Sequence, residues 1–191
     1  VAGDDGGVGL LDGYGLVIFD CDGVLVDSER LTVEVEARVL TEMGWPMTPD
    51  EVVERFVGRS SATMLADIEA RIGAERTVEF DRVSSDEIVA AFDERLAPVD
   101  GIPGVVARLH AAGVATCVAS SGSYPKIDLT LGLTGLLDAF SGRIFSATDV
   151  DHGKPSPDLF LHAAAAMGVE PCRCAVVEDS VPGVLAAVAA G

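Results

Sequence analysis

Basic residues are scarce in this 191-residue chain. Lysine occurs only as Lys126 and Lys154, and 13 basic residues stand against 31 acidic ones, which gives a formal net charge of −18. Such a charge repels nucleic acid and anionic lipid at long range, so neither is an expected partner. Binding of a phosphorylated molecule would need local positive charge from a cation, backbone N–H groups or a few side chains. Each lysine is therefore a candidate for function.

Long hydrophobic runs are also lacking. The longest, such as 181–190, fall well short of the ~18 residues that a membrane span needs, and no basic-then-apolar leader opens the sequence. We therefore expect a cytoplasmic protein. The spacing of Cys172 and Cys174 matches no common zinc motif, so we expect the four cysteines to be reduced and largely buried.

Short apolar runs alternate with helical patterns over most of the chain. The runs predict strands at 16–19, 114–119, 143–145 and 174–177. Helices are predicted at 103–112, 124–131 and 157–167, with Gly113, Gly132 and Gly168 just past their ends. Strands that alternate with helices indicate an α/β fold with a doubly wound parallel sheet.

Residues 28–98 interrupt this alternation. They carry helical patterns near 29–43, 50–56, 60–72 and 84–96, without a convincing strand. We predict a core formed by 16–27 and 99–191, with 28–98 inserted as a helical cap. Open α/β sheets bind ligands at the carboxyl ends of their strands, so the cap could act as a lid there. Residues 1–15 are rich in glycine and aspartate and predict a flexible tail.

Two acids follow the first predicted strand directly, in Asp20-Cys21-Asp22-Gly23-Val24. Both leave the sheet at the same edge, and Gly23 permits a sharp turn. One carboxylate can attack phosphorus while a divalent cation offsets the repulsion between two anions. The other can protonate the leaving oxygen and later activate water. The alternative is an acidic turn that caps the next segment.

Polar residues also follow the other predicted strands. The Ser120 hydroxyl and the N–H groups of Ser121 and Gly122 could bind phosphate oxygens at a helix start, although an ordinary serine N-cap is the alternative. Lys154, just before a helix, can neutralise both a nucleophile and a phosphoryl group. A solvated loop lysine is the alternative for this position.

The Glu178-Asp179 pair ends the last predicted strand. Four carboxyl groups at one sheet edge would repel strongly, and a hard cation such as Mg²⁺, which prefers oxygen ligands, would resolve that repulsion. The alternative is a helix N-terminus that carries acids because the helix dipole favours them.

Taken in order, these four groups resemble the four motifs of the haloacid dehalogenase superfamily, from Leu16 to nearly the end of the chain. Residues 20–29 and 153–158 are most similar to the branch that contains β-phosphoglucomutase and small sugar-phosphate phosphatases. The resemblance implies a Rossmann-like parallel-sheet core with an inserted four-helix cap domain. It also implies a Mg²⁺-dependent enzyme that acts on a small phosphorylated metabolite.

The resemblance assigns a role to each residue. Asp20 would be the nucleophile and a metal ligand, and Asp22 the acid/base that also binds the metal through its backbone carbonyl. Ser120 and Lys154 would hold the transferring phosphoryl group. The Glu178-Asp179 pair would complete the Mg²⁺ site.

Departures from the family patterns narrow the expected reaction. True dehalogenases lack the second acid, Asp22, and phosphonatases use a cap lysine, whereas 28–98 contains none. β-Phosphoglucomutases carry a hinge histidine and a cap arginine where this chain has Thr32 and Ser61. We therefore expect a phosphatase for a small phosphorylated sugar, polyol or sugar acid. A mutase-like phosphotransferase and a non-catalytic binding protein on the same fold are the alternatives.

Two basic residues are candidates for contacts with the rest of the substrate. Arg59, at a predicted helix start, could reach the far end of the substrate, or it could be a solvated arginine. Lys126 is a second candidate for the same task. Because family members usually continue into another strand and helix, we also expect either a missing C-terminal end or a shortened core beyond Gly191.

Overall fold

The computed structural model describes residues 13–59 and 61–191. These residues divide into two compact units, one of residues 13–26 with 98–191 and one within residues 27–97. Most of the predicted flexible tail, residues 1–12, lies outside the described residues. The function of the second unit as a cap stays a prediction.

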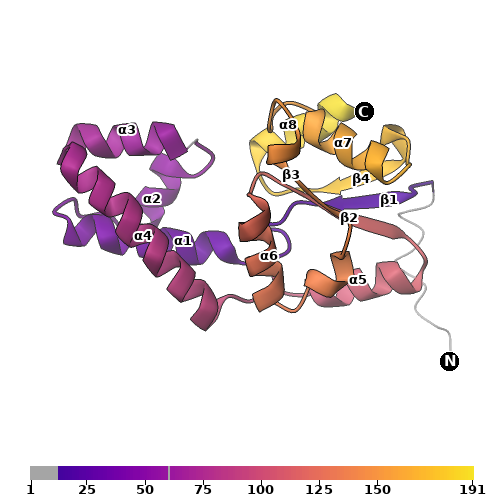
Figure 1. Cartoon of the computed structure of the whole chain (residues 1–191), viewed down its shortest axis with the longest axis horizontal. Helices are drawn as coiled ribbons and strands as arrows, with labels where there is room; N and C mark the ends of the chain where they lie inside the picture. Colours follow the sequence, from indigo (N-terminus) through magenta and orange to yellow (C-terminus); the bar gives the residue numbers. More distant parts are fainter. Residues whose placement is uncertain (1–12, 60) are drawn as a thin grey trace. The chain divides into compact units, whose positions relative to one another are not determined.

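A parallel sheet forms the centre of the first unit (Figure 1). In the described part of the chain its order is β3-β2-β1-β4, from the strands β1 (Leu16–Phe19), β2 (Ala115–Ser120), β3 (Ile144–Ser146) and β4 (Cys174–Val177). β1 pairs with β2 and β4, and all four of its residues are buried. A continuous apolar strand therefore marks the middle of the sheet, as the sequence predicted.

Helices cover both faces of this sheet (Figure 1). One face carries α5 (Ile102–Ala111) and α6 (Tyr124–Leu133), and the other carries α7 (Asp158–Ala166) and α8 (Val181–Ala190). Leu16 and Ile18 of β1 share a core cluster with Phe160 of α7. Phe19 points to the opposite face, where its ring contacts Phe140 at 6.0 Å between centroids. Short 3₁₀ segments complete the unit: η2 (Leu137–Phe140), η3 (Ala147–Asp149) and η4 (Pro171–Arg173).

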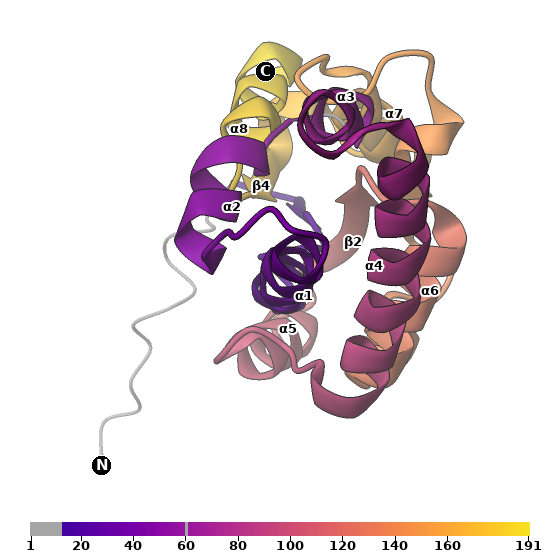
Figure 2. The same ribbon diagram turned by 90° about the vertical axis from the view of Figure 1, so that its left-hand side faces the viewer.

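The described residues of the second unit form helices joined by loops, without a strand. Its helices are α1 (Ser28–Glu42), α2 (Pro49–Phe56), α3 (Ser61–Ile72) and α4 (Ala74–Arg95). α4 packs against both α1 and α3, and α2 packs against α1 (Figure 2). Leu40, Phe56, Ile68 and Phe80 belong to a buried cluster within this unit. The predicted fold class, a parallel-sheet core with a four-helix insertion, is confirmed.

Three details of the prediction are wrong. α4 begins at Ala74, whereas the helix was predicted to begin at residue 84. The prediction began too late because the first half of this helix has few apolar residues. Gly132 lies inside α6, and the left-handed glycine after that helix is Gly135, with φ 72°. Cys172 is exposed, since it lies in η4 before β4, although all four cysteines are free as expected.

The helices of the described residues are all too short or too polar to cross a membrane.

Candidate active site

Two acids at the carboxyl ends of β1 and β4 lie beside Lys154, which belongs to the loop between η3 and α7. The Asp20 N–H donates to the Val177 carbonyl at 3.0 Å, which fixes Asp20 where the two strands end. The Lys154 ammonium donates to Asp20 Oδ1 and to Glu178 Oε2, at 2.6 Å in each case. The Lys154 side chain is only 5% exposed. A buried cation therefore bridges two carboxylates at the predicted edge of the sheet.

Asp179 lies against the turn that follows Asp22. Gly23 in this turn has φ 75°, and a Cβ at that position would overlap the Asp179 carboxylate. Asp20, Glu178 and Asp179 each offer a carboxylate oxygen, and these oxygens lie within 4.8 Å of one another. Oxygen donors at this separation are the kind that Mg²⁺ prefers.

The electrostatics of Asp20 also fit a bound cation. Burial raises the pKa of Asp20 to about 7, Lys154 opposes this rise, and the charge of Glu178 adds to it. The single ammonium of Lys154 thus offsets only part of the penalty that burial places on the ionised carboxylate. A divalent cation beside Asp20 would favour the ionised form that nucleophilic attack requires.

Asp22 is held by the second lysine of the chain. Its Oδ2 accepts a hydrogen bond from Lys126 Nζ at 2.8 Å, and Lys126 lies on α6 with 46% of its side chain exposed. We predicted from the sequence that Lys126 contacts the substrate, and that role stays a prediction. The observed partner of its ammonium is the acid/base candidate itself.

Ser120 ends β2 with a buried side chain. Its Oγ accepts a hydrogen bond from the Gly122 N–H at 3.1 Å. Because the oxygen is the acceptor in this bond, the hydroxyl proton can be donated elsewhere, for example to a phosphate oxygen. The Gly122 N–H donates inside the loop in this structure, and its contact with phosphate stays a prediction. Ser121 N–H stays a predicted backbone donor.

Ser180 and Gly183 hold Glu178, and neither contact was predicted from the sequence. The Ser180 hydroxyl donates to Glu178 Oε1 at 2.6 Å and accepts from the Gly183 N–H at 3.1 Å, so it also caps α8. A Cβ at Gly183 would overlap the Glu178 carboxyl group. The pattern Ser-x-x-Gly at a helix start was visible in the sequence, but its contact with Glu178 depends on the fold.

Arg59 belongs to the second unit, where its Nη1 donates to Asp67 Oδ2 at 3.2 Å. Its side chain is 49% exposed, so the observed contact is a surface ion pair. A contact between Arg59 and a substrate stays a prediction.

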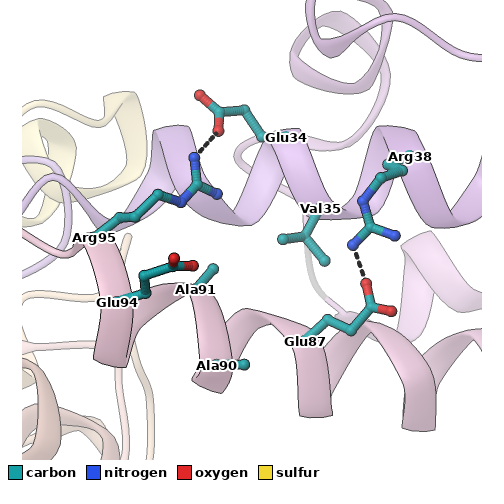
Figure 3. Close-up of a pocket in the computed structure, with 8 residues that line it drawn as sticks. All are labelled: Glu34, Val35, Arg38, Glu87, Ala90, Ala91, Glu94 and Arg95. Atoms are coloured by element: carbon teal, nitrogen blue, oxygen red, sulfur yellow. Dashed lines mark hydrogen bonds and ion pairs between the residues drawn. The ribbon is translucent and has the colours of Figure 1, made fainter.

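A hollow lies between α1 and α4 (Figure 3). Arg95 donates to Glu34 at 3.0 Å, and Arg38 pairs with Glu87. Between these ion pairs the lining is formed by Val35, Ala90 and Ala91, with Glu94 beside Arg95. Both arginines already have carboxylate partners, which makes this hollow a poor match for a phosphate group.

Known proteins resemble the chain over most of its length. The sequence profile of the haloacid dehalogenase-like hydrolases matches residues 14–191. The 6-phosphogluconate phosphatase of Escherichia coli (strain K12) is 34% identical over 176 residues, which are 92% of this chain and 78% of that protein.

Two solved structures share the fold. A haloacid dehalogenase-like protein from Agrobacterium tumefaciens str. C58 has a TM-score of 0.82 and 40% identity, with 93% of this chain and 80% of the other covered. A hydrolase of the same family from Deinococcus radiodurans R1, solved with phosphate and sodium, has a TM-score of 0.81 and 32% identity. That comparison covers 94% of this chain and 78% of the other.

Proposed function

Because the chain belongs to the haloacid dehalogenase-like hydrolases, we propose that it hydrolyses a small phosphorylated sugar, polyol or sugar acid through an aspartyl-phosphate on Asp20. The chain is a phosphoric monoester hydrolase. One observation carries the proposed mechanism: the buried Lys154 bridges Asp20 and Glu178 next to Asp179. The relative that acts on 6-phosphogluconate supports the substrate class.

Asp20 is the proposed nucleophile. Lys154 holds Oδ1, which leaves Oδ2 as the attacking atom. As the bond between Oδ2 and phosphorus forms, the bond from phosphorus to the sugar oxygen breaks, and Asp22 gives its proton to that oxygen. Ser120 and Lys154 donate hydrogen bonds to the phosphoryl oxygens, where negative charge has to be stabilised.

Hydrolysis of the aspartyl-phosphate completes the proposed cycle. Asp22, ionised after the first step, takes a proton from water while the water oxygen attacks phosphorus. The bond between phosphorus and Asp20 breaks, which releases inorganic phosphate and restores the carboxylate. The bond from Lys126 to Asp22 orients the carboxyl group for both proton transfers.

The proposed metal ligands are the carboxylates of Asp20, Glu178 and Asp179, with the backbone carbonyl of Asp22. When bound, Mg²⁺ would supply positive charge that offsets the repulsion between a carboxylate and a phosphate. Arg59 is the proposed contact for the distal end of the substrate.

A screen of phosphorylated metabolites for release of inorganic phosphate tests the proposed function, with 6-phosphogluconate among the substrates. We expect release with Mg²⁺, and none with EDTA or with Asp20→Asn. Asp138→Asn is the matched control, because it removes the same charge from an exposed position in η2. Near wild-type turnover by Asp20→Asn would refute the mechanism, and an isomerised sugar phosphate without free phosphate would indicate a mutase.

A further inference from the structure

Gly122 is bound on both sides by serine hydroxyl groups. Its N–H donates to Ser120 Oγ at 3.1 Å, and its carbonyl accepts from Ser146 Oγ at 2.6 Å. Glycine has the widest conformational freedom of all residues, so without such bonds this position would be the loosest point of residues 120–122. The two hydrogen bonds hold the peptide groups on either side of its Cα. They therefore restrict both of its backbone dihedrals.

The hydroxyl of Ser146 has only one direction in which to donate. Ser146 is the last residue of β3 and is fully buried, at 0% exposure. Its oxygen accepts from the Thr148 N–H at 3.2 Å and from the Thr148 hydroxyl at 3.0 Å. A hydroxyl has two acceptor lone pairs and one proton. With Thr148 at both lone pairs, the proton is directed to the Gly122 carbonyl.

Asp149 fixes the backbone of Ser146 and is itself held by Tyr124. Asp149 Oδ2 accepts from the Ser146 N–H at 3.0 Å and from the Tyr124 hydroxyl at 2.7 Å. Tyr124 is the first residue of α6, the helix that follows the 120–122 loop. The loop is thus tied to the end of β3 through Gly122 and again, just beyond the loop, through Tyr124.

We propose that Ser146 is a positioning residue for the phosphate subsite. It holds Gly122, and through Gly122 it holds the Ser120 hydroxyl and the Ser121 N–H in place before phosphate arrives. Donors that are already oriented stabilise a developing charge without reorganisation when the ligand binds. This inference rests on the proposed function, in which Ser120 donates to the phosphoryl group.

The test compares Ser146→Ala with Ser84→Ala. Ser84 is also buried, and its hydroxyl donates to the Asp81 carbonyl at 3.4 Å within α4. Both variants lose one buried hydroxyl, but only Ser146 contacts the loop. The dissociation constant of inorganic phosphate is measured with Mg²⁺ present, together with the Mg²⁺ activation constant and the melting temperature.

We expect Ser146→Ala to weaken phosphate binding by about tenfold, the effect of losing roughly one hydrogen bond. The Mg²⁺ activation constant should stay within about twofold of the wild type, and Ser84→Ala should bind phosphate like the wild type. A variant that melts earlier but binds phosphate normally would overturn the inference and leave Ser146 with a structural role only.

If Ser146→Ala fails to fold, Thr148→Val provides the second variant. It removes one donor to Ser146 Oγ, so the serine proton gains a second orientation, and phosphate binding should weaken by a few-fold. Unchanged binding in that variant would overturn the inference. A wild-type protein that neither binds nor releases phosphate would instead refute the proposed function.

Discussion

At the scale of single residues, Lys154 is the cation on which two buried carboxylates depend. Its ammonium contacts Asp20 and Glu178, and the Glu178 side chain is only 3% exposed. Lys154→Met would leave both acids without their partner charge. We expect the free energy of unfolding to fall by about 3–5 kcal/mol near neutral pH without Mg²⁺, as measured by urea titration.

Lys126→Met is the matched control for this prediction. Lys126 also pairs with a carboxylate, that of Asp22, but 46% of its side chain is exposed. Water screens such a pair, so the expected loss is below about 1 kcal/mol. Equal losses for the two lysines would contradict the assignment of Lys154 as the buried partner of the site.

Two glycines give a second prediction, because both are the third residue of a helix and both follow a proline. A Cβ at Gly104 meets Arg108 Nη1 at 3.6 Å, an ordinary contact, so Gly104→Ala should stabilise the protein by up to about 1 kcal/mol. A Cβ at Gly183 would overlap the Glu178 carboxyl group, which Lys154 and Ser180 hold in place.

We therefore expect Gly183→Ala to displace Glu178 and to lower kcat by about tenfold or more, as measured by phosphate release. Its melting temperature should also fall, in contrast to that of Gly104→Ala. If both alanines raised the melting temperature and left kcat unchanged, Gly183 would have no part in positioning Glu178.

The sequence singles out some of these residues and not others for a physical reason. Asp20 and Asp179 follow apolar strands, and Lys154 is one of only two lysines. Ser146 lies one residue past the strand predicted at 143–145 and carries no charge. Its partner, the Gly122 carbonyl, lies far away in the chain and becomes its neighbour only through the pairing of β2 with β3.

At the scale of elements, the strands were the best predicted part of the fold. β1 and β4 were predicted at their observed residues, because each is a short apolar run that ends in acids. The first half of α4 was missed, because most of its residues are polar and Val78 is 72% exposed. α4 packs against α1 and α3, and its first half contributes the buried Thr77 and Phe80.

α1 carries a partly buried acid that gives a prediction about pH. Burial raises the pKa of Glu36 from 4.5 to about 7. The folded protein then holds a proton that the unfolded chain releases at the ordinary pKa. The contribution of Glu36 to stability is therefore present below pH 4.5 and is lost as the pH rises to about 7.

Glu36→Gln should remove this dependence. We expect a higher melting temperature than the wild type at ~pH 8, where the native carboxylate is charged, and little difference at ~pH 4. Glu42→Gln is the control on the same helix, because its side chain is 61% exposed and no burial penalty is relieved. A shift of the same size at both pH values would mean that ionisation of Glu36 is not the cause.

At the scale of the whole molecule, the net charge of −18 attracts cations in general. Stabilisation by Mg²⁺ at a specific site therefore has to be distinguished from general screening of charge by salt. We expect Mg²⁺ to raise the melting temperature more than NaCl of equal ionic strength does. The stabilisation should approach about 3 kcal/mol at a hundredfold excess over the dissociation constant. Asp179→Asn should lose the stabilisation by Mg²⁺ that exceeds the effect of NaCl.

Asp138→Asn serves as the control, because it changes the net charge equally at an exposed position outside the acidic cluster. It should respond to Mg²⁺ like the wild type. If Asp179→Asn responded to Mg²⁺ as strongly as Asp138→Asn, the cluster of Asp20, Glu178 and Asp179 would not be the metal site.

The division of the chain into a sheet unit and a helical unit could be anticipated, because residues 28–98 lack the strand runs that surround them. The class of reaction could be anticipated from residues that follow strands. The substrate itself could not, because a few side-chain contacts with the distal end of the substrate decide it. Those contacts follow from the tertiary structure and not from local pattern.

The central claim is that Asp20 becomes phosphorylated during turnover. Its most direct test mixes Asp22→Asn with p-nitrophenyl phosphate and Mg²⁺, quenches the reaction in acid and locates the phosphoryl group by peptide mass spectrometry. This substrate has a leaving group that departs without a general acid, and the variant lacks the base that would hydrolyse the intermediate. We predict one phosphoryl group on the peptide that contains Asp20, and none when Asp20→Asn is added. A phosphoryl group on another residue, or its persistence in the double variant, would contradict the account.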